Sequence, residues 1–550
     1  MSRNLEAIHS RFPFKDGSYR QNQKETIEQL FDLLDDEKVK FVALQQATGT
    51  GKSVIEYMIA QGFDRTIITT PQITLQEQFV NSFKRNNDIG MVCAANNYDC
   101  VNVPDKTCAI GICRRSGADD LLKSTCPFHN AKSEALIKKI AVVNPQYLLN
   151  EINCGVAGSA KFAGNPDGSN KPDLLIIDEA HLLEEAIRSF CTLKINASTN
   201  EKLNITREVP ILTLKNDEYD FKQIINFAKY SAYELTDQMG KLKKDYDKIV
   251  KKHPHELSDM EFSTLQFYHD LDSYYKSFER FLTDINVHQK NWIYTQNDST
   301  YEIQLQPIEL FGLASKYLFT LTQKVLFVSA TILDEKLFAN SLGIQNISFL
   351  RVPSIFDKSK HQVNYMPLGH FNYKNIIESI EVISGALELI LEQHRGQKGI
   401  IHLPSFSVGE LLKTYYTTKK KEHVLKRLLF HTSKDRIDVL EKHIESTEDT
   451  VLVSPSFYEG VDLKDDLSRF QVFTKVPYPN LGDKLVKTKF DRNKQYYQWK
   501  TVLKLVQGAG RSIRGENDWA TSYILDGNFE RLYTQNKKYF NSIDFHFSKI

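Results

Sequence analysis

One short segment near the N-terminus restricts the fold of this chain more than any other. The apolar run KVKFVAL, which ends at Leu44, is followed by the glycine-rich segment QQATGTGKS and then by VIEYMIAQGF, whose composition is compatible with a helix. A strand, a glycine-rich loop and a helix in this order form the P-loop, which binds nucleotide phosphates. The segment therefore predicts an α/β domain that binds a nucleotide.

The residue types within this loop suit that chemistry. Glycines allow backbone N–H groups to approach phosphate oxygens, Lys52 can reach the β- and γ-phosphates of ATP, and the Ser53 hydroxyl can bind Mg²⁺. Gln46 stands where the strict pattern has its first glycine, and the rest of the pattern is kept. The flanking strand and helix disfavour a chance match. The predicted nucleotide-binding residues of the loop are Thr48, Gly49, Thr50, Gly51, Lys52 and Ser53.

A pair of acidic residues follows a second apolar run. Asp178 and Glu179 begin the tetrapeptide Asp-Glu-Ala-His directly after the residues LLII. Because ligands of open α/β sheets bind at the carboxyl ends of the strands, these acids are expected beside the P-loop. Asp178 is predicted to hold Mg²⁺, and Glu179 is predicted to orient and deprotonate the water that attacks ATP.

A third segment, QGAGRSIR, lies near the C-terminus. It places Arg511 and Arg514 three residues apart, on one face of a helix. Arginines that reach a γ-phosphate from a second domain neutralise transition-state charge. By itself the segment fits an exposed helix equally well, but the P-loop and the acidic pair favour a catalytic role. The predicted catalytic residues are therefore Lys52, Asp178, Glu179, Gln507, Arg511 and Arg514.

Further apolar runs predict two sheets. Runs that are apolar on both faces are typical of buried parallel strands. They lie at 65–70, 140–144, 173–178 and 324–331 in the first part of the chain, and at 399–405, 449–454, 470–476 and 521–526 in the second. We expect two α/β domains of similar build. A cysteine-rich stretch and a mostly helical stretch fit neither sheet, and both are interpreted as insertions into the first domain.

Composition excludes some classes of protein. The 70 Lys and Arg residues against 69 Asp and Glu residues give a net charge of +1, which excludes a polycation that binds nucleic acid by bulk charge. No segment approaches the roughly 18 apolar residues of a membrane span, and no signal peptide is apparent, so we expect a soluble intracellular protein. Five of the 7 cysteines lie between Cys93 and Cys126, and in such a protein this clustering favours metal or cluster ligation over disulfides.

The order of the motifs resembles that of one family. The motifs are Phe12–Phe14 with Arg20 and Gln23, the P-loop, Thr74–Gln78, Asn97–Cys100, Cys126–His129, Val143–Asn144, Asp178–His181, Ser329–Thr331, Ser354–Asp357, Ser456–Asp462 and Gln507–Arg514. Over nearly the whole chain they are similar to those of the XPD/DinG family of superfamily 2 DEAH-box, iron–sulfur DNA helicases. The segments Asn97–Cys100 and Glu459–Asp462 distinguish this family from other DEAH-box proteins.

The resemblance implies a fold of two RecA-like P-loop domains, with an iron–sulfur insertion and a helical arch insertion in the first. The implied divisions are helicase domain 1 at 1–90, 139–183 and 307–346, an iron–sulfur domain at 91–138, an arch domain at 184–306, and helicase domain 2 at 347–550.

The implied activity is that of a monomeric, cytoplasmic motor of microbial or viral type. It would hydrolyse ATP with Mg²⁺, walk 5′ to 3′ along single-stranded DNA and unwind forked or 5′-tailed duplexes in DNA repair, replication or recombination. By the same resemblance Gln23 would read adenine, and Gly460 and Asp462 would link the nucleotide to DNA. Two alternatives stay open: a translocase or clamp that displaces proteins without unwinding, and a motor that follows RNA.

For the cysteines, the family implies a [4Fe–4S] cluster. Cys100, Cys108, Cys113 and Cys126 form the pattern C-x7-C-x4-C-x12-C and supply the four thiolates that such a cluster needs. Four thiolates also suit tetrahedral Zn²⁺, and free thiols are the third possibility. Cys93 is the alternative ligand if one of the middle pair is wrong.

Overall fold

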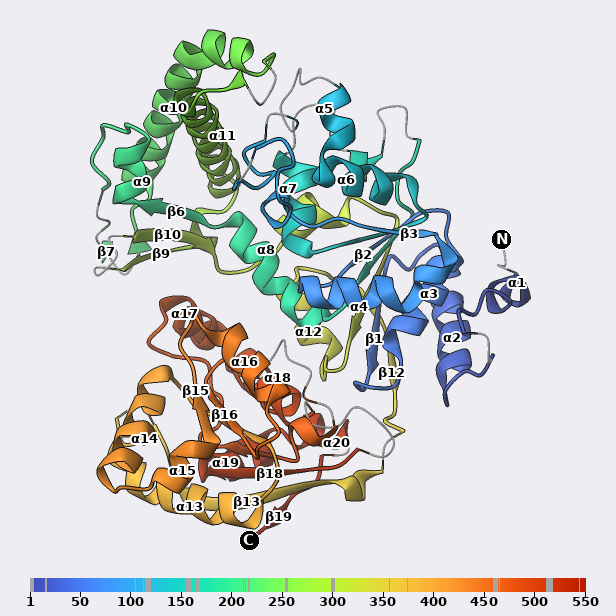
Figure 1. Cartoon of the computed structure of the whole chain (residues 1–550), viewed down its shortest axis with the longest axis vertical. Coiled ribbons are helices and arrows are strands. Elements are labelled where there is room, and N and C mark those ends of the chain that lie inside the picture. Colours follow the sequence, from blue (N-terminus) through green and yellow to red (C-terminus); the bar gives the residue numbers. More distant parts are fainter. Residues whose placement is uncertain are drawn as a thin grey trace.

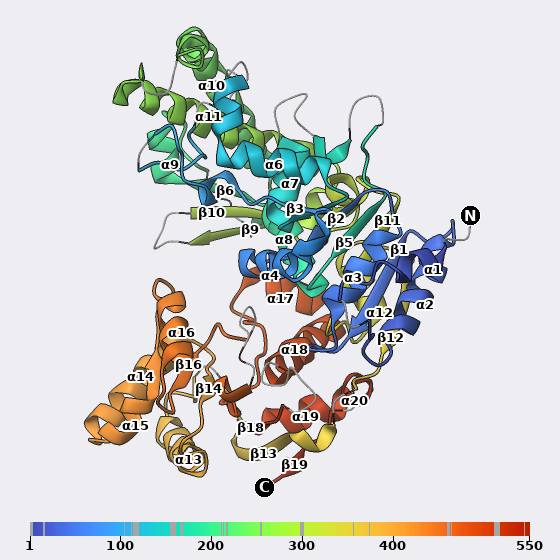
Figure 2. The same ribbon diagram turned by 45° about the vertical axis from the view of Figure 1, so that its right-hand side comes forward.

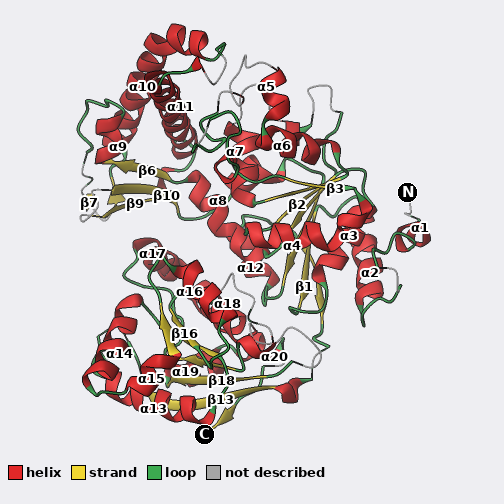
Figure 3. Cartoon of the chain, viewed as in Figure 1, coloured by secondary structure: helices red, strands yellow, loops and turns green. Residues whose placement is uncertain are grey.

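The computed structural model contains two seven-stranded sheets, each covered by helices on both faces (Figure 1 and Figure 3). It describes residues 4–14, 17–103, 105–111, 113, 120–154, 161–164, 169–210, 212, 214–215, 218–252, 256–297, 302–355, 357–372, 374–458, 463, 465–510, 518–543 and 545–550. In this described part, no helix is long and apolar enough to cross a membrane.

The first sheet has the strand order β12-β1-β11-β5-β2-β4-β3, with all neighbours parallel. Its strands are β1 (Phe41–Gln46), β2 (Thr66–Thr69), β3 (Ile89–Met91), β4 (Ile140–Val143), β5 (Leu174–Ile177), β11 (Lys324–Ser329) and β12 (Ser348–Val352). Each apolar run predicted for this sheet contains one of these strands, as expected for buried parallel strands.

The helices of the first domain cover both faces of its sheet. On β1, Val42 and Leu44 pack into the cluster formed with α1 to α4, whereas Ala43 points to the other face, where α6, α7, α8 and α12 pack. These helices are α1 (Leu5–His9), α2 (Gln23–Asp35), α3 (Lys52–Gln61), α4 (Ile73–Phe83), α6 (Pro127–Ile137), α7 (Pro145–Cys154), α8 (Leu183–Cys191) and α12 (Glu335–Ser341).

The second sheet has the order β15-β16-β14-β17-β18-β13-β19 and is also parallel throughout. Its strands are β13 (His361–Gly369), β14 (Gly399–His402), β15 (Leu428–Phe430), β16 (Val451–Ser454), β17 (Phe470–Phe473), β18 (Ala520–Asp526) and β19 (Ser548–Lys549). The surrounding helices are α13 (Ile380–Gln393), α14 (Phe406–Thr418), α15 (Glu422–Arg427), α16 (Arg436–Glu445), α17 (Lys484–Arg492), α18 (Lys494–Ala509), α19 (Asn528–Gln535) and α20 (Lys537–Asn541).

The predicted boundary between the domains at residue 346 needs a correction. β12 pairs with β1 from Val42↔Ser348 to Gln46↔Val352, so the first sheet continues to Val352. This strand escaped prediction because it lies at the sheet edge and its residues are only partly buried, which leaves no continuous apolar run. The short strands β3 and β15 were missed for a related reason, since three residues show no periodicity.

The two insertions lie between strands of the first sheet. The cysteine-rich stretch contains α5 (Asp120–Thr125) and α6, and Gly90 lets α6 approach β3 closely, because a Cβ there would lie 2.6 Å from the backbone of Ala135. The second insertion contains α9 (Ala197–Lys202) and the long antiparallel helices α10 (Lys222–Ile249) and α11 (Asp259–Ile285), which project from the body of the molecule (Figure 1).

The second insertion is less helical than the sequence predicted. It also contains a three-stranded antiparallel sheet of β6 (Leu193–Asn196), β10 (Glu302–Pro307) and β9 (Trp292–Asn297), and the two-residue strands β7 (Leu214–Lys215) and β8 (Glu218–Tyr219). Alternate burial along β10 is the pattern of a strand with one solvated face.

The interface between the two domains contains an apolar core. One continuous cluster contains Phe327 and Ile332 of the first domain together with Trp499, Val502 and Val506 of α18. In both ribbon views, α17 and α18 lie on the side of the second domain that faces the first (Figure 1 and Figure 2). The packed interface positions α18 next to the carboxyl ends of the first sheet.

Candidate active site

The P-loop connects β1 to α3. β1 ends at Gln46 and α3 begins at Lys52, so the glycine-rich segment forms the turn between them. Gly49 and Gly51 have φ values of 77° and 87°, in the left-handed region that residues with a Cβ atom rarely adopt. A Cβ atom on Gly51 would also lie 2.2 Å from Nε2 of Gln23. The loop therefore requires glycine at residue 51 for two independent reasons.

Gln23 is buried against this loop. Its Nε2 atom donates hydrogen bonds to the carbonyl oxygens of Thr50 and Gly51, both at 3.2 Å, and its Oε1 atom accepts one from the Arg20 backbone N–H at 2.7 Å. Arg20 also donates from Nη1 to the Gly49 carbonyl at 2.5 Å. Gln23 thus holds the phosphate-binding loop in shape. Its contact with adenine stays a prediction.

Lys52 lies at the N-terminus of α3, with its ammonium group buried. The Nζ atom has no hydrogen-bond partner among the described residues, and Oε1 of Glu179 lies 3.9 Å away. A helix N-terminus attracts anions through its free N–H groups and its dipole. The lysine and the helix end therefore present an available cationic site beside Glu179.

Asp178 directly follows β5 and is half-buried next to two other carboxyl groups. Burial, and then the charge of Glu179, raise the pKa of Asp178 to about 6. Glu56 lies one turn after Lys52 on α3, and burial together with Asp178 raises its pKa well above the usual value. A divalent cation would offset this negative charge. Asp178 and the exposed Ser53 are oxygen donors at the two ends of this site and suit Mg²⁺, which takes few protein ligands when it binds with a nucleotide.

Hydrogen bonds connect the acidic segment to Ser329–Thr331 of the first domain, and this segment in turn to the second domain. Nδ1 of His181 lies 3.0 Å from the Ser329 hydroxyl, and Nε2 of Gln507 donates to the Thr331 hydroxyl at 2.9 Å. Thr48 in the P-loop also donates from Oγ1 to the Gly510 carbonyl at 3.5 Å. Gln507 lies on α18, so both P-loop and acidic segment are linked to this one helix.

A cavity of about 380 Å³ lies between the domains at this point. It is lined by residues of both, among them Gln45, Thr48, Glu179, Thr331, Arg351 and Gln507. Four predicted site residues, Gly460, Asp462, Arg511 and Arg514, lie outside the residues that the structure describes. Their roles stay predictions. The helix α18 ends at Ala509, directly before the segment that carries the two arginines.

Sequence reasoning missed two residues of this cavity. Gln45 accepts hydrogen bonds at Oε1 from the backbone N–H groups of Ile332 and Leu333, at 2.8 and 2.7 Å. Arg351 donates from Nη2 to the Leu333 carbonyl at 3.0 Å, and Leu333 has a φ of 64°. These contacts hold the turn after Ser329–Thr331. The position of Gln45 directly before the P-loop was a usable signal, whereas Arg351 lies on the unpredicted strand β12.

The four predicted cluster ligands converge in the first insertion. Sγ of Cys113 lies 3.1 Å from Sγ of Cys126, which lies 3.8 Å from Sγ of Cys108. Cys100 is adjacent, because a Cβ atom on Gly111 would contact the sulfur atoms of both Cys113 and Cys100, at 3.2 and 3.8 Å. All four side chains are buried. Among the described residues, no group of three or more His, Cys, Asp or Glu side chains has the arrangement of a metal site, and the thiols contact one another instead.

The chemistry of these four cysteine thiols fits a soft metal centre. Hydrogen bonding from Cys113 lowers the pKa of the Cys126 thiol to about 5, whereas burial raises that of Cys108 to about 12. A bound metal would deprotonate all four thiols. Cys93 lies apart from them, since its Sγ donates to Oε1 of Gln76 at 3.2 Å. The structure therefore groups the four predicted cysteines and leaves out the substitute.

The interdomain cavity and the P-loop beside it have the groups that ATP hydrolysis needs. Lys52 and the N-terminus of α3 can bind the β- and γ-phosphates, and Glu179 can hold and deprotonate the attacking water. Bound Mg²⁺ would neutralise charge on the phosphates. Gln507 reaches the same cavity from the second domain and donates to Thr331 of the first.

The chain is similar to known helicases. The family model described as "Helicase C-terminal domain" matches residues 387–542, and the model "Type III restriction enzyme, res subunit" matches residues 16–207. The chain is 22% identical over 475 residues to "ATP-dependent DNA helicase YoaA" of Escherichia coli (strain K12), covering 78% of this chain and 71% of that protein. It is 21% identical over 577 residues to the protein of the same name from Haemophilus influenzae, covering 88% and 87%.

Solved structures show the same fold. The structure titled "XPD_Helicase" matches with a TM-score of 0.62 and 14% identity, over 97% of this chain and 100% of that one. "Structure of S. tokodaii Xpd4" matches with a TM-score of 0.57 and 16% identity, over 94% and 99%. The order of the motifs, the paired parallel sheets and these matches confirm the predicted resemblance to the XPD/DinG-like family of superfamily 2 helicases, and the matched helicase models and relatives indicate an enzyme that hydrolyses ATP.

Proposed function

We propose that this protein is a monomeric DNA helicase that uses ATP to move 5′ to 3′ along single-stranded DNA and unwinds forked or 5′-tailed duplexes. The observation that carries the proposal is the interdomain cavity, in which Thr48 and Glu179 of the first domain face Gln507 of the second, with Lys52 Nζ 3.9 Å from Glu179. Because ATP would bind to both domains, each cycle of hydrolysis opens and closes the cleft. Repeated closure of this kind drives stepping along a strand.

A second cavity supports a single-stranded track. It has a volume of about 880 Å³ and lies between the cysteine-rich insertion and α11. Its walls contain the cations Lys106 and Lys202, of which Lys202 pairs with Asp270 in the same wall, and the aromatic side chains of Phe262 and Phe267. Lysine contacts to phosphates and stacking of bases on aromatic rings bind single strands with little sequence preference. A strand held here would be separated from its complement by the two insertions.

We further propose that Cys100, Cys108, Cys113 and Cys126 hold a [4Fe–4S] cluster that fixes the fold of the first insertion. The convergence of four buried thiols supports this assignment. Anaerobic purification with iron and acid-labile sulfide analysis tests it. About four irons and four sulfides per chain, with loss of both in Cys126→Ser, are expected. One zinc per chain, or no metal in a folded protein, would contradict the cluster and leave the ATP site intact.

Strand displacement tests the main proposal. Duplexes with a 5′ tail, a 3′ tail or no tail are mixed with the protein and MgATP, and release of the labelled strand is measured. Only the 5′-tailed and forked duplexes should be unwound, and Lys52→Ala should unwind none. Unwinding from 3′ tails would contradict the proposed polarity. Removal of streptavidin from a biotinylated single strand, without strand displacement, would favour the protein-displacing translocase, and equal stimulation of ATP hydrolysis by RNA would contradict the DNA track.

A further inference from the structure

A buried carboxylate immediately follows the acidic segment of the active site. Glu184 lies in the first turn of α8, three residues after His181, and is 4% exposed. No role in ATP hydrolysis requires a charge at this position. A buried carboxylate is costly unless cations and hydrogen-bond donors compensate it, so its partners show what it does.

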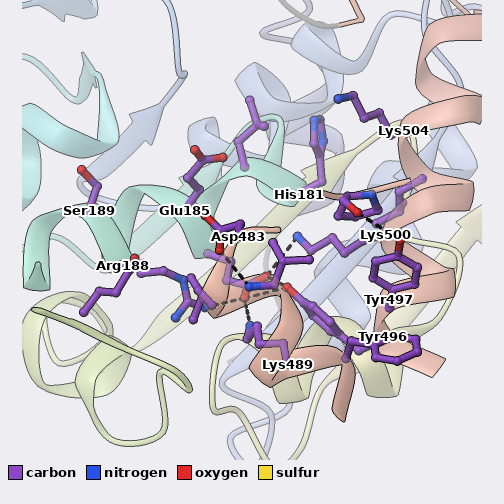
Figure 4. A pocket seen from close by; sticks show the side chains of 18 of the residues that line it. His181, Glu185, Arg188, Ser189, Asp483, Lys489, Tyr496, Tyr497, Lys500 and Lys504 are labelled. Carbon is purple, nitrogen blue, oxygen red and sulfur yellow. Dashed lines mark hydrogen bonds and ion pairs between the residues drawn. The ribbon is translucent and has the colours of Figure 1, made fainter. Parts of the chain in front are cut away.

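These partners come from both domains, as Figure 4 shows. Within the first domain, Nη2 of Arg188 lies 2.6 Å from Oε1 of Glu184. From the second domain, Lys489 of α17 forms an ion pair with Oε1, and Nζ of Lys500 on α18 lies 3.0 Å from Oε2. The Tyr496 hydroxyl donates to both carboxylate oxygens, at 2.8 and 2.6 Å.

The cluster is well shielded from solvent at its centre. The side chains of Glu184, Arg188 and Lys489 are 6%, 9% and 7% exposed, and that of Lys500 is 27% exposed. Burial alone would raise the pKa of Glu184, but Lys500, Lys489 and Arg188 outweigh burial and hold the pKa well below its usual value. The carboxylate is therefore ionised and acts as the shared anion of three cations.

This anion holds one face of α18. Tyr496 and Lys500 contact Glu184, and between them the indole N–H of Trp499 donates to the Ile332 carbonyl at 2.8 Å. Two turns further along the same helix, Gln507 donates to Thr331. Since positions three and four apart share a helix face, these residues form one row that docks on the first domain. The row begins at the Glu184 cluster and ends in the ATP cavity.

We propose that Glu184 is a positioning residue for ATP hydrolysis: its carboxylate anchors the N-terminal part of α18 to the first domain and thereby sets where Gln507 meets the nucleotide. Glu184 touches no reacting atom. It acts through α18, and it ties the position of that helix to the segment Asp178–His181 only a few residues before it. This inference rests on the proposed closure of the two domains around ATP.

An ordinary stabilising ion pair is the alternative explanation. Buried ion pairs contribute little net stability, and their best-attested use is to select one arrangement of packed elements. Here the shared anion lies in one domain, and two of its three cations lie in the other. The cluster therefore selects one orientation of the domains, which a purely local ion pair such as Lys487–Asp491 within α17 does not.

The test compares Glu184→Gln with Asp491→Asn in the full chain. Both changes convert a carboxylate to an amide, but Asp491 is exposed and pairs only within α17, with Lys487 Nζ at 2.6 Å. For Glu184→Gln we expect the kcat of ATP hydrolysis to fall about tenfold while the KM for ATP stays within twofold, since the P-loop is untouched. Dyes at the exposed residues 37 and 422 should report a wider distribution of interdomain distances by energy transfer. Asp491→Asn should change neither quantity.

Two further variants distinguish a failure of the proposed anchor from misfolding and from a failure of the proposed ATPase. Lys500→Gln leaves Glu184 paired with Arg188 and Lys489, so it weakens the link to α18 without stranding a buried charge, and a smaller shift of kcat and distance in the same direction is expected. Unchanged kcat and unchanged distances in folded Glu184→Gln, or in Lys500→Gln if Glu184→Gln does not fold, overturn the proposal. Lys52→Ala should abolish turnover and leave the distances unchanged, so a failure of the proposed ATPase is distinguished from a failure of the anchor.

Discussion

Both sheets of this protein contain an inner strand that is followed by a loop and a helix, but only the first builds the loop from glycine. β1 leads through QQATGTGKS into α3, whereas β14 leads through Leu403-Pro404-Ser405 into α14. A proline has no N–H group to offer a phosphate, and the second loop has no lysine at its end. The two domains are similar in build but contribute different parts of the site: the first contains the loop that suits phosphates, and the second supplies α18.

The two sheets also differ in the surroundings of the aspartates at their strand ends. Asp178 follows β5 and lies among other carboxyl groups. Asp526 ends β18, and its carboxylate accepts hydrogen bonds from the backbone N–H groups of Phe371, Val476 and Asn528, at 3.1, 3.0 and 3.0 Å. Repulsion keeps the first aspartate available for a cation, while donors occupy the second. Position in the fold alone therefore does not make an aspartate catalytic.

The largest effect is expected from Lys52→Ala, paired with Lys413→Ala on α14 as the matched change in the second domain. Loss of Lys52 removes the buried cation beside Glu179, and ATP hydrolysis should fall by at least about 10³-fold. Lys413 is exposed on the helix that follows β14, and its loss should change the rate by less than twofold. Phosphate release at saturating MgATP measures both. A large loss of ATP hydrolysis in Lys413→Ala would contradict the claim that only the first domain supplies the phosphate-binding lysine.

Exchange of the two aspartates for asparagine should separate activity from stability. Asp178→Asn should lower ATP hydrolysis by about 10²-fold, because it weakens the Mg²⁺ site, and it should leave the thermal unfolding temperature unchanged or higher. Asp526→Asn weakens several charge-assisted hydrogen bonds and should destabilise the second domain by about 1.5–3 kcal/mol. The unfolding temperature and the rate of phosphate release are measured for each of the two variants. The reverse pattern would show that the roles of the two aspartates are exchanged.

The sequence was sufficient where function depends on a short segment. The P-loop, Asp178 and Glu179 could be predicted because their strand, loop and helix are adjacent in the chain, and the structure brings Lys52 to 3.9 Å from Glu179. The cysteine pattern likewise predicted four thiols that the structure groups together. Such motifs can be recognised in a single sequence because the residue types and their spacing determine the chemistry directly.

Contacts between distant segments could not be predicted in this way. Gln45 binds the backbone of Ile332 and Leu333, and Glu184 pairs with cations of α17 and α18, yet nothing near either residue in the sequence indicates these distant partners. The strand β12 was missed because an edge strand needs no continuous apolar run. The arrangement of the two domains determines these features, so they appear only when the tertiary structure is known.

A smaller effect is expected at the contact between the domains. Gln507→Leu keeps the approximate volume of the side chain but removes the donor to the Thr331 hydroxyl at 2.9 Å. One such hydrogen bond contributes about 1 kcal/mol, so kcat should fall about fivefold with little change in the KM for ATP. Thr331→Val should give a similar loss, and the double variant should be no worse than either single variant. Additive losses in the double variant would show that the two residues act separately.

A pH dependence is expected for the metal site of the first sheet alone, and it is small near neutral pH. Since Mg²⁺ binds the ionised carboxylate, and burial together with Glu179 raises the pKa of Asp178 to about 6, the apparent affinity for Mg²⁺ should fall about twofold at pH 6 and about tenfold at pH 5, relative to pH 8. The sign for stability is opposite: a raised carboxyl pKa stabilises the metal-free fold below pH 4, and this contribution is lost as pH rises through 6. Titration of MgATP-dependent hydrolysis at each pH measures the first effect. Asp526→Asn should keep the same profile, and an Mg²⁺ dependence that is flat from pH 8 to pH 5 in the wild-type protein would show that Asp178 does not bind the metal.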